Sequence, residues 1–245
     1  MVAFTLFPMG NFTYATAMTQ ITLHYAPDNA SAIIRLALAR ARLPYATRLV
    51  DRSTQAQRTP AYLALNPMGQ IPALETPDGV ICETAAILLW IAQAAPASGL
   101  MPEHSASHAA AQKWLVYLSN TLHVDLRQSF YPHLYIDAAH CDALQRHARH
   151  RVVEHFTLFE THAMGQIDPA HDALAVGLYA GFLYRWAQLY PEPKVIDLSG
   201  CHRVTAALRT LETYDWLQDA LFEEGMSGPI FTDPHPPNPP YGSAT

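Results

Sequence analysis

Residues 66–84 say most about how this chain folds. They read Asn-Pro-Met-Gly-Gln-Ile-Pro-Ala-Leu-Glu-Thr-Pro-Asp-Gly-Val-Ile-Cys-Glu-Thr. Pro72 stands at the entry to a predicted strand over residues 73–76, where a missing backbone N–H is tolerated. Pro-Asp-Gly at 77–79 is a turn sequence, because proline presets φ and glycine accepts a positive φ. A second strand over residues 80–82 then completes a predicted hairpin.

Two polar residues follow the hairpin, at the point where a helix is expected to begin. Thr84 is the candidate N-cap of a helix over residues 85–95, and Glu83 precedes it. A hairpin, a proline in front of it and polar residues at a helix N-terminus together predict a pocket for a small charged ligand. The simpler interpretation is an ordinary hairpin beside a capped helix.

The residues before this segment predict a strand, a helix and a second strand. Residues 21–25 alternate as a half-buried strand does, apolar residues recur at helical spacing over 31–42, and residues 46–50 form the second strand. Such a unit implies parallel pairing with a right-handed crossover. The hairpin adds antiparallel strands, and the helix after it covers the sheet. This order of elements is what a thioredoxin-like α/β domain requires.

On these elements, residues 20–100 resemble the glutathione-binding half of a glutathione S-transferase. The resemblance implies a cis peptide bond before Pro72 and pairing of the Ile71 backbone with the cysteinyl unit of glutathione. It also implies that Glu83 and Thr84 hold the γ-glutamyl end. With Gln70, these residues form the expected glutathione-binding set. Glutathione is then expected as a co-substrate, with no metal.

The second part of the chain is expected to be helical. Helices are predicted over residues 105–126, 141–164, 173–189 and 204–222, and long helices with short breaks indicate a bundle. The predicted fold class is therefore an α/β thioredoxin-like domain followed by an all-α helical bundle. The predicted divisions are an extension of unknown role (1–19), the thioredoxin-like domain (20–96), a linker (97–104), the helical domain (105–231) and a Pro-rich tail (232–245). The tail is expected to be extended, either lying across the body of the protein or free.

One local feature departs from the family pattern. Glutathione transferases usually begin the helix that here contains Arg185-Trp186 with a capping Ser or Thr and an Asp three residues later. Leu174 and Gly177 occupy those places in this sequence, so we expect the Asp172 carboxylate to cap the helix instead.

Composition excludes several classes of protein. The net charge is −6 and 15% of the residues are charged, which argues against a broad nucleic-acid-binding surface. No apolar run approaches ~20 residues, so no membrane span is expected. The three cysteines, Cys82, Cys141 and Cys201, are far apart and fit structural thiols in a reducing, cytoplasmic compartment. Histidines are scattered along the predicted helix over 141–164 without an H-E-x-x-H motif, so a metal site is not expected.

Thiolate activation is expected at the turn that follows the first strand. Unpaired N–H groups and the helix dipole favour an anion at the start of a helix. Ala30 stands where bacterial beta-class enzymes of the family have Cys, and Asp28 stands where other classes have Ser. The remaining candidate donors are Asn29, Ser31 and Tyr25, with backbone N–H groups as a competing source. We expect the Asn29–Ser31 turn rather than Tyr25, because Tyr25 lies on the same face of the alternating strand as Ile21 and Leu23, which favours burial.

The resemblance implies an adjoining apolar pocket for a small hydrophobic electrophile. Trp114, Tyr117 and Tyr131 are the candidate lining residues, although core packing explains most such aromatics. The expected function is conjugation of glutathione to that electrophile by a homodimeric enzyme, in which a helix-covered face of the first domain meets the partner's helical domain. The alternatives are a non-catalytic glutathione-binding or protein-interaction module, or a glutathione-dependent disulfide or peroxide reductase.

Overall fold

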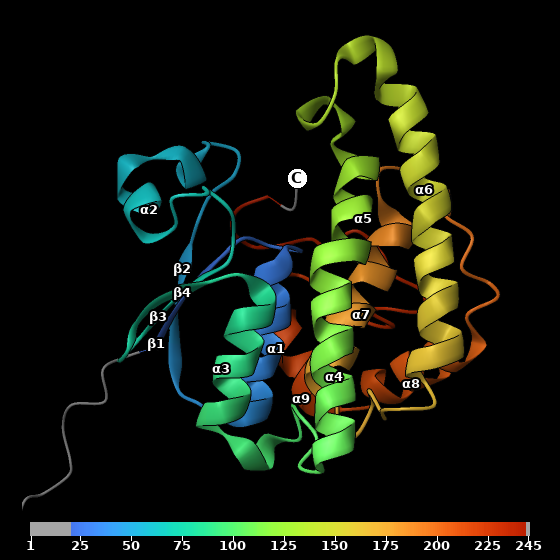
Figure 1. The fold of residues 1–245 in the computed structure, drawn as a ribbon. Coiled ribbons are helices and arrows are strands. Elements are labelled where there is room, and N and C mark those ends of the chain that lie inside the picture. Colours follow the sequence, from blue (N-terminus) through green and yellow to red (C-terminus); the bar gives the residue numbers. More distant parts are fainter. Residues whose placement is uncertain (1–20, 244–245) are drawn as a thin grey trace, which may run out of the picture.

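The computed structural model describes residues 21–243. Two bodies lie side by side: a small sheet with its helices, and a larger group of helices (Figure 1). This arrangement confirms the predicted fold class. The extension predicted over residues 1–19 lies outside the described residues.

The sheet has the strand order β2-β1-β3-β4. β1 (Ile21–Tyr25) pairs in parallel with β2 (Tyr45–Leu49) and antiparallel with β3 (Ala73–Thr76), and β3 pairs antiparallel with β4 (Gly79–Cys82). The predicted strand–helix–strand unit and hairpin are therefore confirmed, with boundaries shifted by one residue at β2 and β4.

Helices cover the two faces of the sheet. α1 (Ala30–Ala41) and α3 (Thr84–Ala94) lie on the face turned towards the helical domain (Figure 1). The other face packs on α2 (Pro60–Leu65), where Tyr62 joins Val50 and Ala73 in a small core. A short 3₁₀ helix, Ala56–Arg58, leads into α2.

The helical domain contains the predicted bundle with several changes in its boundaries. The predicted helix over 105–126 is α4 (Ser105–Tyr117), a π-helical turn (Leu118–Leu122) and α5 (His123–Phe130). The next is α6 (Cys141–Leu158), followed by a π-helical turn (Phe159–Ala163). The single helix predicted over 204–222 is two helices, α8 (His202–Glu212) and α9 (Asp215–Phe222). Short 3₁₀ helices span Pro96–Ser98, Pro132–Leu134 and Ala138–His140. No helix in the described part of the chain is both long and apolar enough to cross a membrane.

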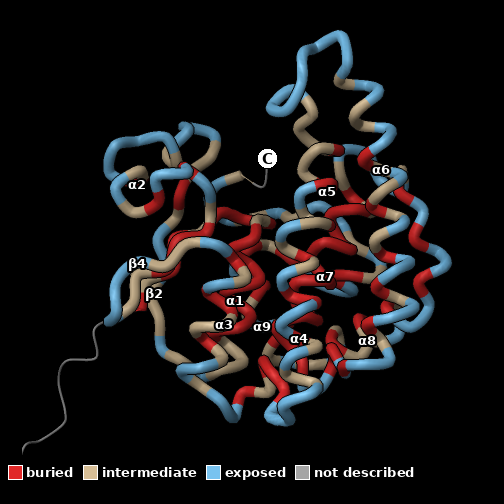
Figure 2. Tube along the Cα trace, in the orientation of Figure 1, coloured by how far each residue is buried: buried red, intermediate tan, exposed pale blue. Residues whose placement is uncertain are grey.

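α7 (Leu174–Leu189) is the central helix of the bundle and is buried along nearly its whole length (Figure 2). The expected capping by Asp172 is wrong, because no side chain caps this helix. Instead the N–H groups of Leu174 and Ala175 donate to the carbonyl oxygens of Gly99 and Leu100, at 3.1 and 2.9 Å. The linker backbone therefore satisfies helix donors that would otherwise be unpaired.

The Pro-rich tail lies across the body of the protein. The Asn238 N–H donates to the Gly225 carbonyl oxygen at 2.9 Å, and Arg185 Nη2 donates to the His235 carbonyl oxygen at 2.9 Å. Further along the tail, Gly242 lies against Leu49 and Pro27. The tail therefore connects the helical domain to the β1–α1 turn of the first domain.

Candidate ligand site between the two domains

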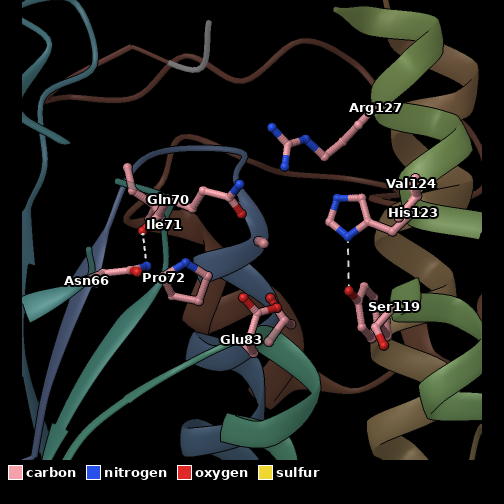
Figure 3. A pocket seen from close by; sticks show the side chains of 12 residues that line it. Asn66, Gln70, Ile71, Pro72, Glu83, Ser119, His123, Val124 and Arg127 are labelled. Atoms are coloured by element: carbon pink, nitrogen blue, oxygen red, sulfur yellow. Dashed lines mark hydrogen bonds between the residues drawn. The ribbon is translucent and has the colours of Figure 1, made fainter. Parts of the chain in front are cut away.

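A cavity of about 210 Å³ lies between the sheet domain and α5. All five residues predicted to bind glutathione line it, and side chains from the helical domain form the opposite wall (Figure 3). The first wall consists of Ala30, Asn66, Gln70, Ile71, Pro72, Glu83 and Thr84, and the second of Ser119, His123, Val124, Arg127 and Tyr179. The structure therefore brings the predicted binding set together at one domain boundary.

The loop before Pro72 is fixed by hydrogen bonds to one carbonyl group. The Ile71–Pro72 peptide bond is cis, which confirms this part of the prediction. Asn66 Nδ2 and the Tyr62 hydroxyl both donate to the Gln70 carbonyl oxygen, at 2.8 and 2.7 Å. Within the described residues, no hydrogen bond engages the peptide groups of Ile71, so they are free to pair with an extended ligand.

Glu83 and Thr84 stand at the N-terminus of α3, with roles that differ from the prediction. Glu83, not Thr84, occupies the N-cap position, with φ 69° and ψ 115°. A non-glycine residue with this backbone conformation is strained and persists only where the surrounding structure imposes it. The conformation leaves Glu83 exposed at the cavity, while Thr84 is buried as the first residue of the helix.

The β1–α1 turn does not offer all the donors that were predicted. Asn29 is the N-cap of α1, and its side chain makes no capping hydrogen bond. The Ser31 hydroxyl is fully buried and donates to the Ala26 carbonyl oxygen at 3.0 Å, so the expectation that it is free for a thiolate is wrong. Ala30 is the residue of this turn that lines the cavity, and it has no polar side chain.

Asp28 explains why the turn holds its shape. Its buried carboxylate accepts hydrogen bonds from Arg185 Nε and Nη2, Trp186 Nε1 and the Tyr190 hydroxyl, all at 2.9–3.0 Å. The Asp28 N–H donates to Oε2 of Glu224, which also forms a buried ion pair with Arg35. The carboxylate is therefore a structural counter-ion for α7 and is already neutralised by Arg185.

Tyr25 lies outside the residues that line the cavity. It is half-buried, and the Arg35 guanidinium lies over its ring at 4.8 Å from the ring centroid. Burial raises the pKa of its hydroxyl above the ordinary value. This arrangement gives Tyr25 a packing role and no visible contact with the cavity.

His123 is the functional candidate that the sequence analysis missed. Its Nδ1 lies 2.9 Å from the Tyr179 hydroxyl, and its other ring nitrogen faces the cavity (Figure 3). Burial, with a further contribution from Arg127, lowers the pKa of His123 to about 4, so the ring is neutral at pH 7. The spacing of four residues between His123 and Arg127 was the available signal, because such residues share one face of a helix.

The three aromatic residues predicted to line an adjoining electrophile pocket are not among the residues that line this cavity, so their role stays a prediction. Trp114 Nε1 donates to Gln166 Oε1 at 3.2 Å, and the Tyr117 hydroxyl lies 2.6 Å from His155 Nδ1. The Tyr131 hydroxyl accepts from Arg52 across the domain boundary at 3.3 Å.

The cysteines also lie away from the cavity lining. Burial raises the pKa of the Cys82 thiol, and it raises the pKa of Cys201 to about 11. Cys141 makes only long contacts to the carbonyl oxygens of Ile136 and Asp137, at 3.9 and 3.7 Å. None of the three thiols is therefore placed to act on a ligand in this cavity. Within residues 21–243, no three His, Cys, Asp or Glu side chains are grouped to hold a metal ion.

The fold and the cavity define a class: a thioredoxin-like domain with a cis-proline site facing a helical domain. Residues 30–94 match the family model described as "Glutathione S-transferase, N-terminal domain". The chain is 28% identical over 211 residues to glutathione S-transferase GST-4.5 of Xanthomonas campestris pv. campestris, covering 84% of this chain and 99% of that protein. Residues 30–94 therefore correspond to the N-terminal domain of glutathione S-transferases, and the chain is similar to these enzymes along most of its length.

Two solved structures support the same assignment of the fold. A glutathione S-transferase from Xylella fastidiosa is 26% identical, with a TM-score of 0.73 over 84% of this chain and 99% of that one. A glutathione transferase homologue from Sulfitobacter, solved with bound glutathione, is 23% identical with a TM-score of 0.73, over 85% of this chain and 99% of that one.

Proposed function

We propose that this protein is a glutathione transferase that binds glutathione in the interdomain cavity and transfers its thiolate to a small electrophile. The observation that carries the proposal is the convergence of the cis Ile71–Pro72 bond, Glu83 and Thr84 on one cavity. The bound glutathione in the Sulfitobacter homologue supports the choice of ligand. The three free thiols fit a reducing, cytoplasmic compartment.

Different residues of the cavity wall are suited to bind the different parts of glutathione. Ile71 offers unpaired backbone groups to the cysteinyl unit. The Glu83 carboxylate can pair with the γ-glutamyl ammonium, and charge-assisted contacts of this kind are the strong ones. The first N–H groups of α3, beginning at Thr84, can donate to the α-carboxylate of the γ-glutamyl unit.

The glutathione sulfur is then expected between the start of α1 and His123. Ala30 lines the cavity there and leaves room, and the first N–H groups of α1 are donors for a thiolate. The side-chain amide of Asn29, which precedes Ala30 in the chain and makes no capping hydrogen bond, is proposed as a further donor. His123 is the donor on the opposite wall. When the Tyr179 hydroxyl donates to Nδ1, the neutral ring carries its proton on the nitrogen that faces the cavity.

The pH dependence of conjugation with an aromatic halide tests this assignment. Asn29→Ala and His123→Asn should each raise the apparent pKa of the bound thiol, and losing one well-placed donor costs up to ~10²–10³ in rate. Tyr25→Phe is the matched control and should leave that pKa unchanged. If only Tyr25→Phe raises the apparent pKa of the bound thiol, the tyrosine activates the thiol. A wild-type protein that binds glutathione without conjugation to any electrophile would support the non-catalytic alternative.

The proposal includes a homodimer with two-fold symmetry. Val80 on β4 and Val116 on α4 are apolar side chains exposed at the surface, at 43% and 47%. A dimer in which the hairpin side of one subunit meets the α4 side of the other would bury both, and two-fold dimers are the commonest closed assembly. Sedimentation at micromolar concentration should give twice the 27.1 kDa chain mass, and a monomer would contradict this arrangement.

A further inference from the structure

Arg127 carries a guanidinium group without a partner inside the cavity. The side chain extends from α5 towards the opposite wall (Figure 3). Within the described residues, no hydrogen bond or ion pair engages this guanidinium group. Three other arginines differ in this respect, because Arg185, Arg35 and Arg151 form ion pairs with Asp28, Glu224 and Asp125.

Arg127 is the positively charged residue among those that line the cavity. Among the lining residues, Glu83 is the one carboxylate, and it belongs to the opposite wall. His123, one helical turn before Arg127, stays neutral at pH 7 because its pKa is lowered to about 4. The cavity therefore has one negative group on the sheet domain and one positive group on α5. A ligand with an ammonium group at one end and a carboxylate at the other matches this arrangement.

We propose that Arg127 binds a carboxylate of the ligand held in this cavity, through the paired N–H donors of its guanidinium group. This inference rests on the proposed function. Two sources can supply the carboxylate: the glycyl end of glutathione, or an acidic group on the electrophile. If the electrophile supplies the carboxylate, the cavity selects an acidic electrophile, in contrast to the hydrophobic electrophile expected from the sequence. Arginine suits the role because its planar fork matches carboxylate geometry.

The test uses Arg127→Gln, Arg127→Lys and a control, Arg146→Gln, which removes an exposed arginine from α6. Calorimetry compares glutathione with its glycyl ethyl ester. Steady-state conjugation compares para-(bromomethyl)benzoate with its methyl ester. Hydrogen bonds to charged groups contribute ~1.5–3 kcal/mol, so removing the guanidinium should weaken binding of the acidic ligand ~10–100-fold. Arg127→Lys should restore part of this loss, and thermal melting checks that each variant is folded.

The calorimetric and kinetic comparisons distinguish the two possible sources of the carboxylate. If Arg127→Gln weakens glutathione and leaves the glycyl ester unchanged, the carboxylate is that of glutathione. If it raises KM for the benzoate and leaves the methyl ester unchanged, the carboxylate belongs to the electrophile. If Arg127→Gln and Arg146→Gln have the same affinity for glutathione and its ester, and the same KM for the benzoate and its ester, the inference is overturned. Failure of the wild-type protein to bind glutathione would instead overturn the proposed function.

Discussion

At the scale of single residues, the most informative position is Glu83, because its backbone conformation is unfavourable for any residue with a side chain. A φ of 69° with ψ 115° favours glycine, yet the chain places a glutamate there. Strain of this kind costs of order 1–3 kcal/mol and gathers at ligand sites. The strain is explained if the carboxylate is needed at the cavity.

If the strain is real, glycine at position 83 should give a more stable protein than alanine, which is the reverse of the usual order. Alanine normally stabilises a chain relative to glycine, but the positive φ should make Glu83→Gly more stable than Glu83→Ala by about 1 kcal/mol. Urea unfolding of the two variants measures the difference. A more stable alanine variant would show that the backbone relaxes without cost.

His123 links the cavity to the pH dependence of stability. The pKa of His123 is about 4 in the folded protein, below its ordinary 6.5, so between these values the unfolded chain binds a proton that the folded chain does not. The folded state therefore loses stability as the pH falls through this window. The difference in unfolding free energy between wild type and His123→Asn should shrink from pH 7 to pH 5. A difference that stays constant would contradict the assigned burial.

At the scale of elements, the start of α7 depends on close contact between backbones. A Cβ atom at Gly177 would lie 1.9 Å from the Pro169 carbonyl oxygen, so the helix can approach this loop only with glycine at that position. The linker carbonyls of Gly99 and Leu100 then reach the first N–H groups of the helix. In the family pattern a side chain caps this helix. Here backbone carbonyl groups satisfy its first N–H groups, and Gly177 allows the close approach of the helix to the neighbouring loop.

Gly177→Ala should accordingly destabilise the protein strongly. Overpacking a core typically costs ~1–3 kcal/mol, and a clash with backbone should cost at least the upper end of that range. Gly200→Ala is the matched control, since a Cβ there meets nothing within 4 Å. Thermal and urea unfolding of both variants provide the measurement. Similar melting temperatures for the two variants would mean that the loop moves aside easily.

The elements of the first domain were predictable because their signals are local. Strand alternation, the Pro-Asp-Gly turn and the proline before β3 each act within a few residues, and the structure has them within one residue of the predicted bounds. The helical wall of the cavity was not predictable in this way. Its composition depends on the π-helical turn over 118–122 and on which helix face packs against the sheet domain.

At the scale of the whole molecule, buried charges tie three distant segments together. Asp28 of the β1–α1 turn is held by Arg185 of α7, and Arg35 of α1 is held by Glu224 after α9. Arg185 also donates to the carbonyl oxygens of Ile230, just before the tail, and of His235 within it. The turn beside the cavity is therefore positioned by the helical domain and the tail.

A double-mutant cycle tests this connection. Asp28→Ala leaves Arg185 buried without its counter-ion, and breaking a buried pair costs about 3–5 kcal/mol. Adding Arg185→Met removes the unpaired charge, so the double variant should be no less stable than Asp28→Ala alone. Additive losses in urea unfolding would show that the two side chains act independently.

Calorimetric titration of the intact protein with glutathione measures binding in the interdomain cavity directly. We expect wild type to bind glutathione at one site per chain, Glu83→Ala to weaken binding ~10-fold or more through loss of a charge-assisted contact, and the exposed control Glu103→Ala to behave as wild type. Absence of binding by wild type, or equal affinity of the Glu83 and Glu103 variants, would contradict the site described for this chain.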